Sequence, residues 1–439
     1  MKKLTLLSLA SLMSLASFAE GYQVNLQSAK QAGMGHVGVA MKLGAESMHF
    51  NPAGMAFMEG TADFSAGISG VYAYANYQNG DYKAHTDNDV STPMYAYAGF
   101  KVYDNLAIGF SLTTPYGSGI KWPNTWAGAD LVQEINMKSF VLQPTISWKP
   151  LENFSIGGGL MLAKGDFNLS RALITGQDLL DLGLPVDPST ADLNMVSAKL
   201  HGKSSVKFGF NVGVLWDINK QWSVGASYRS RMNMHAKKGT AEMEYLNSQV
   251  EALVATLISL GKFPPIDKGT FDAELPLPAN LTVGVAYKPV EKLTLGLDLQ
   301  MVGWGAYDKL VINFDESVLD GYSISAKKDY KNTFTARLGA QYAMTDRLDL
   351  RAGVYFDQSP VKSQNYNPET PGMNKIGTSL GASFRPFNGF SIDLSLLYIA
   401  GLSRDGSYTY ETVFKTEKTF SGRYASRAFA PTLGLSYAF

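Results

Sequence analysis

The last twelve residues of the chain, 428–439, read AFAPTLGLSYAF. Bulky apolar side chains and proline occupy every second position, and small or polar side chains occupy the positions between them. The first set is Phe429, Pro431, Leu433, Leu435, Tyr437 and Phe439, and the second is Ala428, Ala430, Thr432, Gly434, Ser436 and Ala438. Because successive side chains of a strand point to opposite faces, the segment predicts a β-strand with one apolar face and one small, polar face.

Residues 293–301, 334–342 and 348–357 repeat this alternation. In each of them the charged side chains, such as Asp298 and Arg337, share a face with glycine and lie opposite the large apolar residues. A charge on the lipid face at the bilayer midplane costs roughly 2–4 kcal/mol, so this segregation is typical of transmembrane strands. The C-terminal phenylalanine, with Tyr437 and Leu435 on its face, also resembles the assembly signal of outer-membrane barrels.

Short turns join the alternating segments in pairs, and longer segments join one pair to the next. The short turns lie at Asp104-Asn105, Leu151-Glu152-Asn153, Asn219-Lys220-Gln221, Val290-Glu291-Lys292, Thr345-Asp346-Arg347 and Asn388-Gly389. These hairpins and their flanking strands predict an all-β protein, an antiparallel barrel of about 14 strands. An even number of strands lets such a barrel close with both chain ends on the periplasmic side, and closure leaves no unpaired edge in lipid.

The first 19 residues have the features of a secretory signal peptide. Lys2 and Lys3 precede the apolar stretch 4–15, and Ser17-Phe18-Ala19 places small residues at the two positions that a signal peptidase requires. The apolar stretch is shorter than the ~20 residues of a membrane-spanning helix, so a retained anchor is the weaker interpretation. Cleavage after Ala19 removes both lysines and leaves a net charge of −2.

The composition excludes several classes of function. The chain has no cysteine, which rules out disulfides, thiol catalysis and thiolate metal sites, and we expect no metal and no cofactor. A formal charge of zero gives no reason to expect nucleic-acid binding. Only 17% of the residues are charged, below the roughly 25% of ordinary soluble domains.

The remaining segments suggest a plug and two helical loops. Residues 20–60 are rich in glycine, alanine and methionine and do not alternate, which predicts a compact plug ahead of a barrel at 61–439. The loops 174–204 and 241–270 are partly helical in character. In the second loop, one helix face collects Leu246, Val250, Leu253, Val254, Leu257 and Ile258.

Several short motifs, in order along the chain, resemble one family of outer-membrane proteins. They are Gly33-Met34-Gly35, Gly38-Val39-Ala40, Asn51-Pro52-Ala53-Gly54-Met55, Thr114-Pro115-Tyr116-Gly117, Trp122, Trp126, Tyr330-Lys331 and Phe356-Asp357-Gln358-Ser359-Pro360-Val361. The family is the OmpP1/FadL/TodX group of long-chain fatty acid transporters, and the likeness covers essentially the whole mature chain.

The resemblance implies a 14-stranded barrel in the outer membrane of a Gram-negative-type bacterium, with an N-terminal hatch in its lumen. It implies passive transport of a hydrophobic ligand, most often a long-chain fatty acid, which binds in an extracellular groove and leaves sideways into the membrane. Outer-membrane lipid, lipopolysaccharide and the barrel assembly machinery are the other expected partners.

A sideways exit requires a break in the strand ladder, and Pro115 lacks the N–H that a ladder needs. It follows an alternating run and precedes Tyr116 and Gly117. From the sequence alone, Pro115 could equally end the strand at a loop; the family pattern favours a kink. Asn51-Pro52-Ala53 could likewise be a simple turn. The resemblance places it inside the barrel, where we expect it to couple the hatch to the kink.

A fatty-acid carboxylate needs a cation beside an apolar pocket. The first candidate is Lys331, which matches a lysine of the family motif. The other two are Arg337 and Arg171, whose positions in the alternation of their segments place their side chains on the lumen face. Asn332 and Thr335 depart from the family pattern, and the arginine is displaced by roughly 7 Å along the strand. The alternative for each cation is an ion pair with a lumen aspartate.

Leu246, Val250, Leu253, Leu257 and Ile258 are candidates for the apolar wall of an uptake groove, although the helix could simply pack on neighbouring loops. An enzyme is a poorer interpretation, because no serine–histidine–acid pattern can be assembled around the five histidines. A channel for aromatic hydrocarbons, a porin and a loop-borne adhesin remain as alternatives.

Overall fold

The computed structural model describes residues 21–439 except 185, 262, 264, 266, 267, 317, 319, 320 and 322. The signal peptide predicted at residues 1–19 lies outside the described residues. Among those described, 14 strands pair in a closed antiparallel ring, as the sequence predicts. They are β1 (Ala62–Ser69), β4 (Met94–Tyr103), β5 (Leu106–Thr113), β7 (Glu134–Leu151), β8 (Phe154–Thr175), β10 (Lys207–Asp217), β11 (Trp222–Arg229), β14 (Asn280–Val290), β15 (Leu293–Val302), β18 (Thr333–Thr345), β19 (Leu348–Asp357), β20 (Lys375–Phe384), β21 (Phe390–Glu411) and β22 (Glu417–Ala438).

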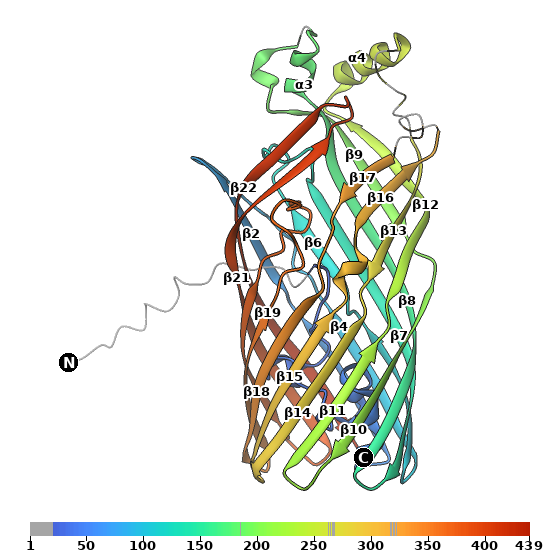
Figure 1. Ribbon diagram of the computed structural model, residues 1–439, viewed down its shortest axis with the longest axis vertical. Coiled ribbons are helices and arrows are strands. Elements are labelled where there is room, and N and C mark those ends of the chain that lie inside the picture. The colour runs from blue at the N-terminus through green and yellow to red at the C-terminus, as the bar shows by residue number, and fades with distance from the viewer. Residues whose placement is uncertain are drawn as a thin grey trace, which may run out of the picture.

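The ring closes between its first and last strands. Asp63 on β1 lies opposite Ala438 on β22, and Ser69 lies opposite Thr432. All six predicted turns join consecutive ring strands at one end of the barrel, the lower end in Figure 1. Since short turns of such barrels face the periplasm, we assign this end to the periplasm and the opposite end, with its long loops, to the exterior.

The alternating faces are arranged as predicted. On β22, Phe429, Leu433 and Leu435 are each 39–45% exposed, whereas Ala428 and Ala430 are at most 1% exposed. The same division holds on the other strands, where apolar side chains form the outer belt and the polar and charged ones are buried inside. The outer face therefore suits lipid, and the inner face is polar.

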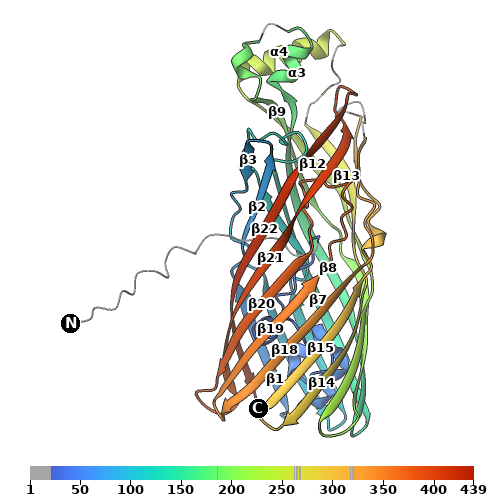
Figure 2. The ribbon, with the colours of Figure 1, turned by 60° about the vertical axis from the view of Figure 1, so that its left-hand side comes forward.

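Additional strands extend the wall toward the exterior (Figure 2). They are β2 (Tyr72–Asn79), β3 (Tyr82–His85), β6 (Gly117–Lys121), β9 (Asn194–Lys203), β12 (Met232–Tyr245), β13 (Gly269–Leu277), β16 (Lys309–Phe314) and β17 (Ser323–Lys327). Helices α3 (Gly176–Asp181) and α4 (Ser248–Ser259) lie at the exterior tip, in the two loops expected to be partly helical, together with the short 3₁₀ turn η3 (Pro188–Thr190). A further turn, η4 (Trp304–Ala306), follows β15.

The N-terminal segment, residues 21–60, lies inside the periplasmic half of the barrel (Figure 1). It folds into four short helical turns, α1 (Ala29–Ala32), η1 (Gly44–Glu46), α2 (Ser47–Phe50) and η2 (Pro52–Phe57). Its small residues let the backbone approach the wall closely. A Cβ added to Gly339 or Gly353 would lie 2.3 Å or less from backbone atoms of Met34 or Gly35, so those wall positions have room only for glycine.

Candidate functional site

The Asn51-Pro52-Ala53 motif is completely buried between the N-terminal segment and the wall. The Asn51 amide donates to the carbonyl oxygen of Val39 (2.7 Å) and to that of Val214 on β10 (2.9 Å). Its side-chain oxygen accepts the Ala53 N–H, which caps η2, and Pro52 occupies the first turn of that helix. One asparagine therefore joins two stretches of the N-terminal segment to the barrel wall.

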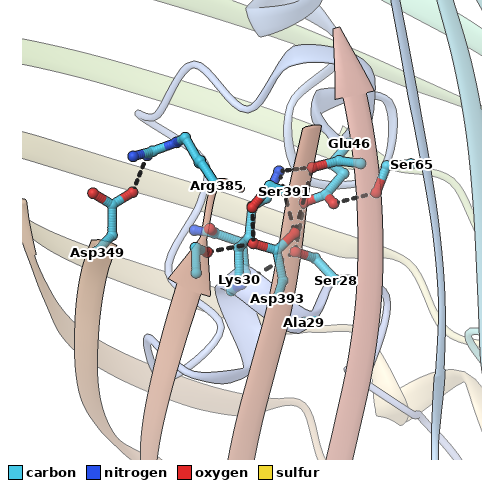
Figure 3. Close-up of polar contacts among 12 residues, drawn as sticks. Ser28, Ala29, Lys30, Glu46, Ser65, Asp349, Arg385, Ser391 and Asp393 are labelled. Carbon is cyan, nitrogen blue, oxygen red and sulfur yellow. Dashed lines mark hydrogen bonds and ion pairs between the residues drawn. The ribbon is translucent and has the colours of Figure 1, made fainter. Parts of the chain in front are cut away.

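A second set of polar contacts anchors the segment on the opposite side (Figure 3). Glu46, 1% exposed, accepts hydrogen bonds from the hydroxyls of Ser28 (2.6 Å) and of Ser65 on β1 (2.5 Å). Lys30 lies 3.6 Å from the carboxylate of Asp393 on β21. Burial lowers the pKa of Lys30, but the carboxylates of Glu46 and Asp393 outweigh it and raise the pKa above its ordinary value. The lysine therefore stays charged.

The third strand of the ring is interrupted at Thr114-Pro115-Tyr116. Thr113 on β5 lies opposite Val141 of β7, but Gly117 on β6 lies opposite Lys138, so the broken strand contains one extra residue. If the β5–β7 register of Thr113 and Val141 continued, Pro115 would lie opposite Ser139. The Ser139 N–H instead donates to the carbonyl oxygen of Tyr116 (3.1 Å). The missing N–H of proline and the shifted register together make a bulge at the position expected for the kink.

Residues 22–24 of the N-terminal segment form hydrogen bonds with the backbone at one edge of this break. Val24 N–H donates to the Pro115 carbonyl (2.8 Å), and Gly117 N–H donates to the Tyr22 carbonyl (2.8 Å). Within the described residues no strand pairing joins β6 to β4. Hydrogen bonds close the interruption at both ends. On the periplasmic side the Met94 N–H donates to the Thr114 hydroxyl, and on the exterior side Lys121 forms hydrogen bonds with residues 87 and 88.

A cavity of about 460 Å³, called here the side cavity, fills this interruption. Its wall side includes Val90, Ser91, Met94 and Gly119, of which Val90 and Met94 are 48% and 40% exposed on the outer surface. Its inner side includes Leu26, His36, Tyr355, Leu397 and Ile399. The side cavity therefore runs from the barrel interior to the outer surface of the wall.

Two smaller pockets adjoin the side cavity. The first, the apolar pocket of about 80 Å³, is lined by Phe167, Leu169, Met234, Leu275, Tyr307 and Leu310, and it shares Ile135 and Met137 with the side cavity. The second, the polar pocket of about 50 Å³, is lined by His36, His49, Arg229, Asn280, Asp298 and Arg337, and it shares Val24 and Tyr116 with the side cavity. The apolar pocket and the polar pocket thus both adjoin the side cavity at the strand break.

The histidines of the polar pocket are neutral. Burial, and then the charge of Arg337, lower the pKa of His36 to about 3. Burial, and then Arg229 and Arg337, hold the pKa of His49 well below its ordinary value. The fixed charges of the polar pocket are therefore those of its arginines and its aspartate.

The three cations expected from the sequence do not lie together. Arg337 is 5% exposed in the polar pocket, donates to the Gln300 side chain (2.6 Å) and lies opposite Asp298 in the β15–β18 register. Lys331 precedes β18, and its side chain is exposed. Arg171 lies in the exterior part of β8 and lines none of these three cavities.

The apolar face of α4 is mostly turned inward. Val250 and Leu257 are 8% and 6% exposed, and Leu253 and Ile258 are partly buried against the same core cluster. Leu246 precedes the helix and is 47% exposed. The helix begins at the Asn247 cap, whose side chain accepts the N–H groups of Gln249 and Val250.

Some residues that line these pockets were not predicted from the sequence. Lys328, 1% exposed, pairs with Glu369 at 2.5 Å at the edge of the apolar pocket, and no local pattern marks either residue. Arg229 could have been found, because it continues the inner parity of Ser223, Gly225 and Ser227 on β11.

The sequence and the fold both match known proteins. A family model described as outer membrane protein transport protein (OMPP1/FadL/TodX) matches residues 10–439. Outer membrane protein P1 of Haemophilus influenzae is 25% identical over 447 residues, which cover 91% of each chain. The long-chain fatty acid transport protein of Salmonella typhi is 23% identical over 426 residues, which cover 92% of this chain and 93% of the relative.

Among solved structures, a FadL homologue of Pseudomonas aeruginosa superposes with a TM-score of 0.81 at 20% identity, covering 95% of this chain and all of the homologue. The Pseudomonas putida toluene transporter TodX superposes with a TM-score of 0.70 at 18% identity, covering 96% of this chain and 99% of TodX. These likenesses show the fold, and the family model adds the relationship. This outer-membrane protein therefore belongs to the OMPP1/FadL/TodX family, whose members transport hydrophobic compounds.

Proposed function

We propose that this protein carries long-chain fatty acids passively across the outer membrane and releases them sideways through the side cavity. The observation that supports this most directly is the side cavity itself, which joins the barrel interior to the lipid-facing surface at the break beside Pro115. The name of the Salmonella typhi relative supports the choice of substrate.

The adjoining apolar pocket gives the route a physical basis. Each methylene group of an acyl chain that leaves water gains about 0.8 kcal/mol, so a water-filled pore is a poor path for it. Aromatic and aliphatic side chains line the apolar pocket, and the N-terminal segment fills the lumen below. A route from the apolar pocket into the side cavity and then into lipid keeps the chain away from water.

Each candidate residue has a place in this proposal. Leu246, Val250, Leu253, Leu257 and Ile258 would line the uptake groove at the exterior tip. Lys331 and Arg171 would meet the carboxylate near the exterior, and Arg337 would meet it deeper in the lumen. Asn51, Pro52 and Ala53 would link the N-terminal segment, as a hatch, to the break at Pro115, Tyr116 and Gly117.

Aromatic hydrocarbons are the second candidate substrate. The solved neighbour TodX is described as a toluene transporter, and the apolar pocket, at about 80 Å³, suits a small ring better than an extended chain. Uptake of labelled oleate and of labelled toluene by the same cells separates the two candidates, because transport of toluene alone would exclude fatty acids.

The test of sideways release is a reversible staple across the side cavity. A Cβ added at Gly119 would lie 3.4 Å from the Ser91 oxygen, which is within the reach of a disulfide. The chain has no cysteine, so the S91C/G119C variant can form only this bond within the chain. We expect oxidation to stop uptake of labelled oleate and reduction to restore it.

Each single-cysteine variant serves as a control for the oxidant and should keep its uptake. Mass spectrometry should show that the bond has formed in the double variant. Full uptake by the stapled protein would exclude release through the side cavity.

A further inference from the structure

The polar pocket carries an excess of positive charge. Its charged lining residues within the described chain are Arg229, Arg337 and Asp298. Asp298 is 1% exposed, and its carboxylate accepts the N–H groups of Gly38 (2.8 Å) and Val39 (3.1 Å). It also lies opposite Arg337 in the strand register. One arginine charge therefore remains to be balanced, because both histidines are neutral.

Arg229 provides this charge. It is 7% exposed, and its guanidinium forms hydrogen bonds with neutral groups: the carbonyl oxygen of His49 (2.9 Å), the His49 ring nitrogen Nδ1 (3.2 Å) and the sulfur of Met161 (3.1 Å). No carboxylate of the described residues lies within 4.0 Å of it. A buried guanidinium without an anion is costly, so this position is suited to a bound anion.

Tyr116 supplies a second donor at the same place. Its side chain is 1% exposed, and its hydroxyl has no hydrogen-bond partner among the described residues. Tyr116 and Arg229 both line the polar pocket and interact electrostatically. A hydroxyl and a guanidinium that converge on one small space are typical donors to a carboxylate.

We propose that Arg229 and Tyr116 form a binding site for one carboxylate, which holds the head group of the substrate at the strand break while its chain occupies the side cavity. The two spaces share Val24 and Tyr116, so a head group in the polar pocket can continue into an apolar chain in the side cavity. The proposal rests on the proposed function, because it names how that route handles the charged end of its substrate.

The experiment compares oleate with oleyl alcohol, which has the same chain and no charge. Wild type, R229Q and Y116F are purified in detergent, and binding of each ligand is measured by equilibrium dialysis. Oleate labelled with ¹³C at its carboxyl group reports the protonation of the bound head group by NMR. We expect R229Q to weaken oleate binding about tenfold or more, Y116F to weaken it less, and both to leave the alcohol unchanged.

The carboxyl titration provides a readout that a structural role would not change. In wild type the bound acid should titrate at lower pH than in R229Q, because the guanidinium favours the anion. The matched control is R351Q, since Arg351 is also buried in the lumen but has the carboxylate of Asp349 at 3.6 Å. It should bind both ligands as wild type does.

The outcomes separate the two proposals. If the wild type binds oleate and R229Q binds it equally well, the proposed carboxylate site is wrong, but the proposed transport route is unaffected. Equal loss of oleate and alcohol in R229Q would also overturn the site, since the arginine would then act through the fold. Failure of wild type to bind oleate at all would overturn the proposed function itself.

Discussion

Single buried residues fix the N-terminal segment within the lumen. Glu46 illustrates this, because its two carboxylate oxygens accept hydroxyl groups from different parts of the chain, Ser28 in the segment and Ser65 in the wall. Lys30 and Asp393 form an ion pair nearby (Figure 3). Hydrogen bonds to a buried charged group contribute more than neutral ones, so this contact is a main anchor of the segment.

We expect Glu46→Gln to destabilise the docked segment by about 2 kcal/mol, because it removes the charge and one acceptor. Hydrogen exchange at residues 28–48 should speed up, while exchange in β18 and β19 stays as in wild type. Lys42→Gln is the control, since Lys42 is 42% exposed and its pair with Asp217 contributes about 1 kcal/mol or less. Equal protection in Glu46→Gln and wild type would show that the anchor lies elsewhere.

At the scale of one element, the break between β5 and β6 depends on one missing donor. Without Pro115 the strand could donate to β7 at Ser139 and keep the register of Thr113 and Val141. The bulge makes β6 diverge from β4, and residues 22–24 pair with its edge instead. A proline within a strand thus creates a site where the N-terminal segment and the wall meet.

Pro115→Ala should restore this donor and favour a continuous strand. We expect slower uptake of labelled oleate, with an unchanged amount of folded barrel in the outer membrane. The matched control is Pro431→Ala on β22, since that proline lies within a continuously paired strand. Uptake at the wild-type rate in Pro115→Ala would argue against a role of the bulge in release.

At the scale of the whole molecule, a closed wall surrounds a filled interior. The 14 strands form the ring without help from the N-terminal segment, since β1 pairs directly with β22. The segment fills the periplasmic half and contacts strands on opposite sides, through Asn51 to β10 and through Lys30 to β21. The barrel should therefore conduct few ions although its inner face is polar.

Deletion of residues 21–58 should convert the protein into an open pore. In planar bilayers we expect small steady conductance for wild type and large ohmic steps for the deletion variant, as in porins with open lumens. Circular dichroism of the variant should still report a folded β-barrel. Large ohmic steps from the wild-type protein would contradict a filled lumen.

The sequence by itself determined the wall of this protein. Alternation of period two sorts side chains between lipid and lumen within each strand, and both the hairpin turns and the strand ends are local signals. For that reason the strand number, the six turns and the inner position of Arg337 could be predicted. For residues 20–60, which do not alternate, the composition predicted a compact plug, and the family resemblance implied that it lies in the lumen.

Only the tertiary structure decided which polar groups meet inside the wall. The alternation of side chains holds only within an uninterrupted strand, so it cannot place Lys331, which precedes β18, or Tyr116, which lies within the bulge. Contacts across a lumen depend on the tilt and stagger of all strands and on the packing of the segment within them. Arg229 and Tyr116, more than a hundred residues apart in the sequence, are brought together by that long-range geometry.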